Sequence, residues 1–140
     1  MRSLIAVLAL AGATVSALAL QVHYSTATQP CSINERWDCG VVNHSPFAVI
    51  GHVPVAAVGI AGYVILAALA LVRQRFVLFV AATIGLIYSL RLTFIEEFDL
   101  LTWCLYCVIS QAIIALIFLL SLGWFTAEYL ALKRAARGTN

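Results

Sequence analysis

The sequence predicts an all-α protein: a transmembrane four-helix bundle with a cysteine-bearing extracytoplasmic loop and a short half-helix. Hydrophobic residues make up 64% of the 140 residues and charged residues only 10%, whereas a soluble domain holds roughly a half and a quarter. The apolar residues gather in long runs, each near the roughly 20 residues that cross about 30 Å of hydrocarbon. By length we expect a single integral membrane domain over 1–140.

The apolar runs are predicted to be helices, because backbone groups inside lipid must be hydrogen-bonded within their own segment. The expected spans cover about residues 3–22, 53–72, 76–95 and 103–127. The segment 23–52 is the one long polar stretch between them. It is therefore the expected outer loop.

The orientation follows from the charged residues. One side of the predicted bundle is basic, with Arg2, Arg73, Arg75, Lys133, Arg134 and Arg137. The other side is mostly acidic, with Glu35, Arg36, Asp38, Glu96, Glu97 and Asp99. The positive-inside rule then predicts cytoplasmic N- and C-termini and an extracytoplasmic loop. Because the basic residues are topology signals, membrane lipid is the expected partner and nucleic acid is not.

The N-terminal run has a second interpretation. Arg2, an apolar stretch and the small residues near Ala17 and Ala19 are also compatible with a cleaved secretory signal. The run is long for a signal peptide, which favours a retained helix. Cleavage would leave the orientation of the other three helices unchanged.

The outer loop carries one cysteine pair and one helix-start signal. Cys31 and Cys39 are separated by seven residues. Ser45 followed by Pro46 is typical of an N-cap with proline at the first helical position. We therefore expect a brief amphipathic or re-entrant helix that ends near Gly51 and leads into the second span.

The second cysteine pair lies at the mouth of the fourth helix. Cys104 and Cys107 are three residues apart, hence on one helix face and within disulfide reach. Asp99 and Thr102 precede them and are candidate caps. The free N–H groups and the dipole of a helix N-terminus favour a thiolate. Redox chemistry, a structural disulfide and a metal site are all compatible with this motif alone.

The presence of two cysteine pairs favours redox chemistry over a structural disulfide or a metal site. Cys31 and Cys39 fall on the same predicted side as Cys104 and Cys107, and no other cysteine exists. Disulfides persist outside the cytosol. Two dithiols on one extracytoplasmic face favour a relay of thiol–disulfide exchange.

Several local patterns occur together in the chain. They are Cys31-x7-Cys39, Ser45 six residues after Cys39, Gly51-x-Val53-Pro54, and Trp103-Cys104-Leu105-Tyr106-Cys107. The combination resembles the vitamin K epoxide reductase (VKOR) family, in particular bacterial-type homologues without a fused thioredoxin-like domain. The resemblance implies a bundle around a quinone pocket in a bacterial inner membrane. It also implies electron flow from an extracytoplasmic thioredoxin-like protein to a quinone, which supports disulfide bond formation.

The resemblance assigns roles to the cysteines. Cys104 and Cys107 match the active-site pair, with Cys107 facing the quinone and Cys104 exchanging with the loop. Cys31 and Cys39 match the shuttle pair. Cys39 is then the expected partner of Cys104, and Cys31 is the sulfur open to the thioredoxin-like protein.

Candidate quinone-binding residues are Ser45, Phe47, Tyr106 and Gln111, for a quinone of the ubiquinone, menaquinone or vitamin K type. Vertebrate members have a tyrosine where this chain has Gln111, and their quinone-contacting asparagine aligns at or near Phe47. These departures weaken vitamin K epoxide as a substrate and leave quinone reduction intact. Ser45 has an alternative role as a helix N-cap, and Gln111 has one in an interhelical hydrogen bond.

Two further residues are weaker candidates. Arg91 is an intramembrane charge, which is a functional candidate by default. The alternative is that it snorkels outward or pairs with an acidic residue of the outer side. His52 lies beside the expected pocket entry and is a candidate proton shuttle, with an interfacial histidine as the alternative.

Two non-enzymatic functions stay open. The four cysteines with His44 could hold zinc, since thiolates suit that metal. Alternatively both disulfides could be structural staples of a four-span membrane protein. We expect no metal, and we favour the redox function over both of these alternatives.

Overall fold

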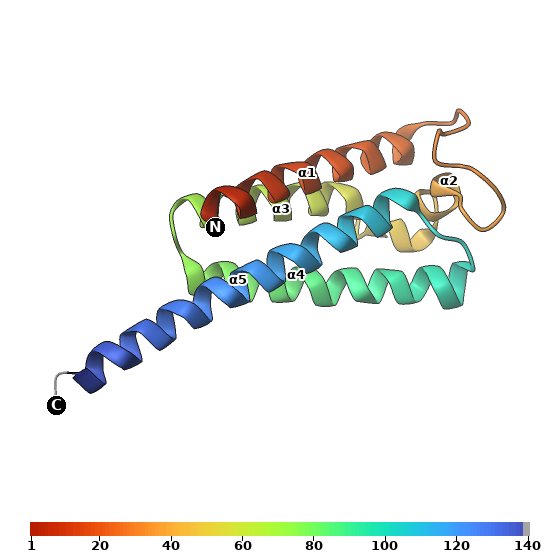
Figure 1. Cartoon of the computed structure of the whole chain (residues 1–140). Helices are drawn as coiled ribbons and strands as arrows, with labels where there is room; N and C mark the ends of the chain where they lie inside the picture. Colours follow the sequence, from red (N-terminus) through yellow and green to blue (C-terminus); the bar gives the residue numbers. More distant parts are fainter. Residues whose placement is uncertain (139–140) are drawn as a thin grey trace.

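The structure, a computed structural model, describes residues 1–138 and contains four long helices (Figure 1). They are α1 (Arg2–Tyr24), α3 (Val55–Leu71), α4 (Arg75–Ile95) and α5 (Leu105–Gly138). Helix α1 packs along both α3 and α5, and α4 packs along α5. The predicted all-α four-helix bundle with a cysteine-bearing loop is confirmed.

The two ends of the bundle differ. The N-terminus, the link between α3 and α4 and the projecting end of α5 lie at one end (Figure 1). The loop that follows α1 lies at the opposite end, beside the link between α4 and α5 (Figure 1). Both cysteine pairs therefore lie at the end that is distant from the two termini.

The loop contains several short elements. They are α2 (Cys39–Asn43), a 3₁₀ turn (Pro46–Ala48), β1 (Val49–Ile50) and β2 (Val53–Pro54). The expected start at Pro46 is right, but the expected half-helix to Gly51 is wrong, because the chain leaves the 3₁₀ turn for a β-hairpin. β-Branched residues favour extended backbone, and Gly51 takes the left-handed conformation (φ 58°) at the turn.

The long helices also differ from the predicted spans at their ends. Helix α3 starts later than expected, because Val53 and Pro54 pair in the hairpin. Helix α4 continues into a π-helical turn, η2 (Glu96–Leu100), which ends at Leu101 with a left-handed φ of 53°. Helix α5 runs to Gly138, past the expected end at 127.

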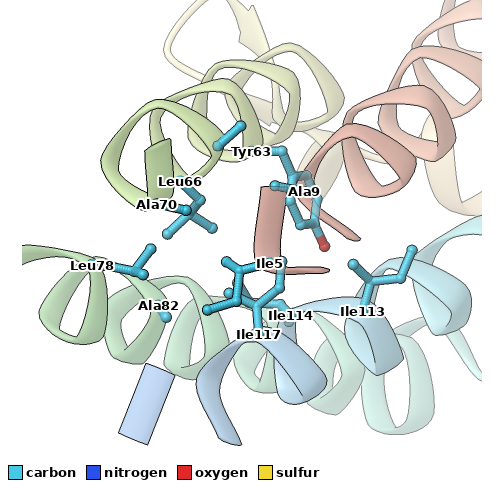
Figure 2. Close-up of a cluster of buried hydrophobic side chains, with 11 residues drawn as sticks. Ile5, Ala9, Tyr63, Leu66, Ala70, Leu78, Ala82, Ile113, Ile114 and Ile117 are labelled. Carbon is cyan, nitrogen blue, oxygen red and sulfur yellow. The ribbon is translucent and has the colours of Figure 1, made fainter. Parts of the chain in front are cut away.

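The core is built largely from alanine and branched aliphatic side chains (Figure 2). Its buried members are Ile5, Ala9, Tyr63, Leu66, Ala67, Ala70, Leu78, Ala82, Ile113, Ile114 and Ile117. Small residues let the helices approach closely: a Cβ at Gly12 would meet the Tyr63 ring at 2.4 Å. The Tyr63 hydroxyl donates to the Ser110 carbonyl at 2.7 Å and so ties α3 to α5.

Large apolar side chains cover the outside of the bundle. Leu10, Ile84 and Leu119 are 58%, 64% and 59% exposed. Three helices, Arg2–Tyr24, Arg75–Leu100 and Leu105–Gly138, are long and apolar enough to cross a membrane, and α3 is a shorter apolar helix. At about 1.5 Å per residue, α3 rises about 26 Å, near the lower limit for a span. The chain is an integral membrane protein.

Candidate functional site

Backbone hydrogen bonds join the loop to the segment that precedes α5. The Asp38 N–H donates to the Trp103 carbonyl at 3.0 Å, and the Trp103 N–H donates to the Arg36 carbonyl at 2.7 Å. Trp37 and Trp103 form an isolated parallel bridge, with ring centroids 6.1 Å apart. These bonds bring the residues directly before Cys39 and Cys104 side by side.

The four cysteines consequently gather in one cluster. Cys31 and Cys39 form a disulfide, whereas Cys104 and Cys107 are free thiols. Cys39 and Cys104 are fully buried, Cys31 is 2% exposed, and Cys107 is half-buried at the edge of the cluster. Val22 of α1 closes the cluster together with Val42 of α2. The structure thus brings the two sequence-predicted pairs together.

Asp38 shapes the loop around the disulfide. Its carboxylate caps α2 by accepting from the N–H groups of Gly40 (2.8 Å) and Val41 (3.3 Å). It also accepts from the Ser32 hydroxyl at 2.7 Å. The Ser32 bond is the largest cause of a lowered pKa at Asp38, and the two amide bonds act in the same direction. A short helix is thereby fixed directly at Cys39.

Asn43 links the two cysteine pairs, and the sequence reasoning did not identify it. Its side-chain amide donates to the Cys39 carbonyl at 2.9 Å and lies 3.5 Å from the Cys104 sulfur. The residue is 6% exposed, and its own carbonyl lies 2.5 Å from Nδ1 of His23 on α1. Its spacing of four residues from Cys39 is the available sequence signal, since such residues share a helix face.

Cys104 precedes α5 and acts as its N-cap. Its sulfur accepts from the Cys107 N–H at 3.4 Å, and its own N–H donates to the Glu96 carboxylate at 3.1 Å. The expected caps are therefore wrong: Asp99 is exposed, and the Thr102 hydroxyl donates to nearby backbone carbonyls. Glu96 reaches Cys104 because the π-helical turn folds back toward α5.

The pKa of the Cys104 thiol is lowered. The largest cause is a hydrogen bond from the Cys107 thiol, and the Cys107 N–H and the Asn43 amide act in the same direction. Burial and the charge of Glu96 oppose them. A thiolate at Cys104 is the expected consequence, because the hydrogen bonds stabilise the charged form.

A cavity of about 560 Å³ opens beside the cysteine cluster, and its walls come from the loop and all four long helices. Most of the lining side chains are apolar. The predicted site residues Ser45, Phe47, Tyr106 and Cys107 all lie in its wall. The Ser45 hydroxyl donates to the Val42 carbonyl at 2.7 Å and does not accept from an N–H of the turn. Ser45 occupies the N-cap position of the 3₁₀ turn without a side-chain cap.

Gln111 does not belong to the cavity wall. Its side-chain oxygen accepts from the Ser89 hydroxyl at 3.4 Å and from the Thr93 hydroxyl. Both partners lie on α4, so Gln111 joins α4 to α5. This contact is the interhelical hydrogen bond that was the alternative role of Gln111.

Two weaker candidates lie away from the cavity. Arg91 is exposed, and within residues 1–138 it forms no ion pair with an acidic residue of the outer side. Glu97 pairs instead with Arg36 at 3.4 Å and accepts from the Trp103 indole at 2.8 Å. His52 is exposed in the hairpin turn and does not line the cavity.

The zinc alternative finds no ligand set in the described part of the chain. Among residues 1–138, no three His, Cys, Asp or Glu side chains gather in a group that could hold a metal ion. Nδ1 of His44, the C-cap of α2, lies 2.8 Å from the Gly40 carbonyl. The four sulfurs are divided into a disulfide and two thiols.

Comparison with known proteins identifies the family of the chain. The model of the vitamin K epoxide reductase family matches residues 3–122, which include the loop, the cavity and both cysteine pairs. A comparison with curated proteins gives no match. Membership implies an oxidoreductase. With the match covering most of its length, the chain belongs to the vitamin K epoxide reductase family.

Proposed function

We propose that the chain is a quinone-dependent thiol–disulfide oxidoreductase. It takes electrons from an extracytoplasmic thioredoxin-like protein and so supports disulfide bond formation. The observation that carries the proposal is the convergence of both cysteine pairs in one cluster beside the cavity. Cys39 and Cys104 pack in one buried cluster, Asn43 contacts both residues, and Cys107 lines the cavity.

The relay is a sequence of balanced exchanges. A partner thiolate attacks Cys31, Cys39 leaves as a thiolate, and the partner's second thiolate releases Cys31. Cys39 then attacks the Cys104–Cys107 disulfide at Cys104 and expels Cys107. Cys31 attacks Cys39, which restores the loop disulfide and frees Cys104. The structure has a loop disulfide and two free thiols, which is the state that follows this internal transfer.

Access to the loop sets a condition on the first exchange. Cys31 is 2% exposed, so a partner cannot reach its sulfur until the loop opens. Ile33 and Val41, close in sequence to the disulfide, are 65% and 49% exposed. We infer that the partner docks on this apolar rim and that docking exposes Cys31.

The cavity suits a quinone ring. Its volume of about 560 Å³ falls within the roughly 300–1,000 Å³ of small-molecule sites. Phe47 and Tyr106 offer aromatic faces, and Ser45 is among the few polar groups of the wall. When bound, a ubiquinone, menaquinone or vitamin K type molecule supplies the two-electron acceptor. Cys107 is the thiol of this chain that faces it.

The charge distribution supports the orientation of the relay. Arg73 and Arg75 lie at the end of the bundle that carries the termini, and Glu35, Asp38 and Glu97 lie at the cysteine end. With the positive end in the cytoplasm, the cysteines face an extracytoplasmic compartment, as in a bacterial inner membrane. Such a compartment permits disulfides to persist.

The test measures quinone reduction by the purified chain in detergent, with either a reduced thioredoxin-like protein or a small dithiol as donor. Cys104→Ala and Cys107→Ala should lose activity with both donors. Cys31→Ala and Cys39→Ala should lose it with the protein donor and keep it with the small dithiol. If all four variants reduce quinone like the unmodified chain, the cysteines are structural and the proposal is wrong.

A further inference from the structure

A buried carboxyl group lies between the thiols and the cavity. Glu96 is 3% exposed and belongs to the cavity wall. Its Oε2 accepts from the Cys104 N–H at 3.1 Å. Cys107 lines the same cavity. Glu96 therefore contacts one residue of the free thiol pair and shares the cavity wall with the other.

The backbone turns Glu96 away from the neighbouring acidic residues. It is the first residue of the π-helical turn η2, and its carbonyl accepts from the Thr102 N–H at 3.2 Å. Glu97 instead faces Arg36 and the Trp103 indole, and Asp99 is exposed. Among the three acids of this turn, Glu96 is the buried one.

Glu96 has no cationic partner in the described chain. The ion pairs within residues 1–138 are Arg36–Glu97 and Arg75–Glu128. A buried carboxylate without a cation is costly, so such a group holds a proton in at least one state. The titratable groups that face this region are the thiols of Cys104 and Cys107 and the cavity phenols of Tyr63, Tyr88 and Tyr106.

We propose that Glu96 is a catalytic proton-transfer residue: its carboxylate takes the proton of the Cys107 thiol and releases it into the cavity. The inference rests on the proposed quinone reductase function and adds the route of one proton. Closing Cys104 and Cys107 into a disulfide releases two electrons and two protons. Reduction of a quinone to a hydroquinone consumes the same number of each.

The two protons follow different routes. The Cys107 proton passes through Glu96 to the cavity, because Glu96 is the acid that shares the cavity wall with that thiol. Cys104 reacts as a thiolate, so its proton has already left the pair, and the second proton of the hydroquinone comes from water. Glu96 is then again a carboxylate, ready for the next dithiol.

Glu96 also contributes to the start of α5, so the test must separate capping from proton transfer. Glu96→Gln keeps a side-chain oxygen for the Cys104 N–H but cannot take a proton. Glu96→Asp keeps the acid on a shorter side chain. Glu97→Gln is the matched control, because it removes a neighbouring acid that does not line the cavity.

The first readout is the infrared difference spectrum between the dithiol and disulfide forms of the purified chain, without quinone. Without a quinone to receive it, the Cys107 proton stays on Glu96, so proton transfer predicts a protonated-carboxyl band that appears on oxidation, is absent in Glu96→Gln and persists in Glu97→Gln. A band that is missing in the unmodified chain, or unchanged in Glu96→Gln, would overturn the inference. Thermal unfolding of each variant shows whether it is folded.

The second readout is quinone reduction with a small dithiol. Glu96→Gln should be slower by about 100-fold or more, as for the loss of a general acid–base group, and Glu96→Asp should recover part of the rate. If Glu96→Gln reduces quinone as fast as the unmodified chain, only the role of Glu96 is refuted. An unmodified chain that does not reduce quinone refutes the proposed function itself.

Discussion

The two cysteine pairs are held in different ways. Around the Cys31–Cys39 disulfide, side-chain bonds are local in sequence, such as the one from the Ser32 hydroxyl to Asp38, and a few bonds join the loop to the segment before α5. Cys104 is held by Glu96 at the end of α4 as well as by Asn43 of the loop. The loop can open by breaking its few bonds to that segment, whereas Glu96 and the start of α5 keep the second pair beside the cavity. The first pair suits a carrier and the second suits a fixed reaction centre.

The largest effect is expected at Asn43, which links the two cysteine pairs. Asn43→Ala removes a buried donor from the Cys39 carbonyl and the Cys104 sulfur, at a cost of about 1–3 kcal/mol. Transfer from the loop dithiol to the helix pair should slow by about tenfold or more. Rapid quenching with an alkylating reagent, followed by mass spectrometry, measures that transfer.

The matched control for Asn43→Ala is Asn34→Ala. The Asn34 side chain accepts from the N–H groups of Arg36 and Trp37, so its loss loosens the loop without touching Cys104. Small dithiols should then reduce the loop disulfide faster, with a lesser change in internal transfer. Equal slowing of transfer in both variants would contradict a specific role for Asn43.

A second prediction concerns the ionisation of the fixed pair. The pKa of Cys104 is lowered chiefly by the hydrogen bond from the Cys107 thiol. Cys107→Ala should therefore raise the pKa of Cys104, and Cys107→Ser, which keeps a hydroxyl donor, should raise it less. The measurement is the pH dependence of Cys104 alkylation in the reduced protein. An unchanged profile in Cys107→Ala would show that this hydrogen bond does not hold the thiolate.

A smaller effect is expected in the loop. Asp38→Ala removes the cap of α2 and should lower the free energy of unfolding by about 1 kcal/mol, whereas Asp38→Asn keeps an acceptor and should cost less. The lowered pKa of Asp38 means that its stabilisation is present above the unfolded value of about 4. It is lost as the pH falls through the folded value. Thermal unfolding across acidic pH should show this dependence in the unmodified chain and not in Asp38→Asn.

The smallest effect is expected at the Arg36–Glu97 ion pair, whose side chains are 66% and 39% exposed. Arg36→Ala should change the free energy of unfolding by no more than about 0.5 kcal/mol, and salt should reduce the difference. Glu97→Ala should cost more, because Glu97 also accepts from the Trp103 indole. If Arg36→Ala lowered the free energy of unfolding more than Glu97→Ala does, the exposed ion pair would stabilise the fold more than solvent screening permits, and the prediction would be wrong.

The fold was largely predictable because its signals are strong and local. Long apolar runs can form only helices in lipid, so the four spans follow directly from the sequence. The hairpin after Ala48 was missed because Ser45 and Pro46 mark a helix start but not its length. The extension of α4 into a π-helical turn leaves no clear signal, because Glu96 continues the helix with ordinary backbone angles.

The candidate site was predictable only where residue type carries the chemistry. Cysteine is a residue type whose chemistry is recognisable in a sequence, and the distribution of charge predicted both pairs on one side of the bundle. Asn43 and Glu96 could not be identified in the same way. Their contacts with Cys104 form only when segments distant in sequence pack together. Glu96 was interpreted as a topology charge and a possible partner for Arg91. Gln111 lies one turn after Cys107, yet its side chain contacts α4, a direction that spacing alone does not give.

The most direct test of the relay is to trap its internal step. In the double variant Cys31→Ala, Cys107→Ala, the remaining thiols are the two that the relay joins. Mild oxidation of the purified chain should then give an intramolecular Cys39–Cys104 disulfide, detected as a linked peptide by mass spectrometry without reductant. Free thiols, or disulfides only between two chains, would show that the pairs do not exchange electrons and would contradict the account.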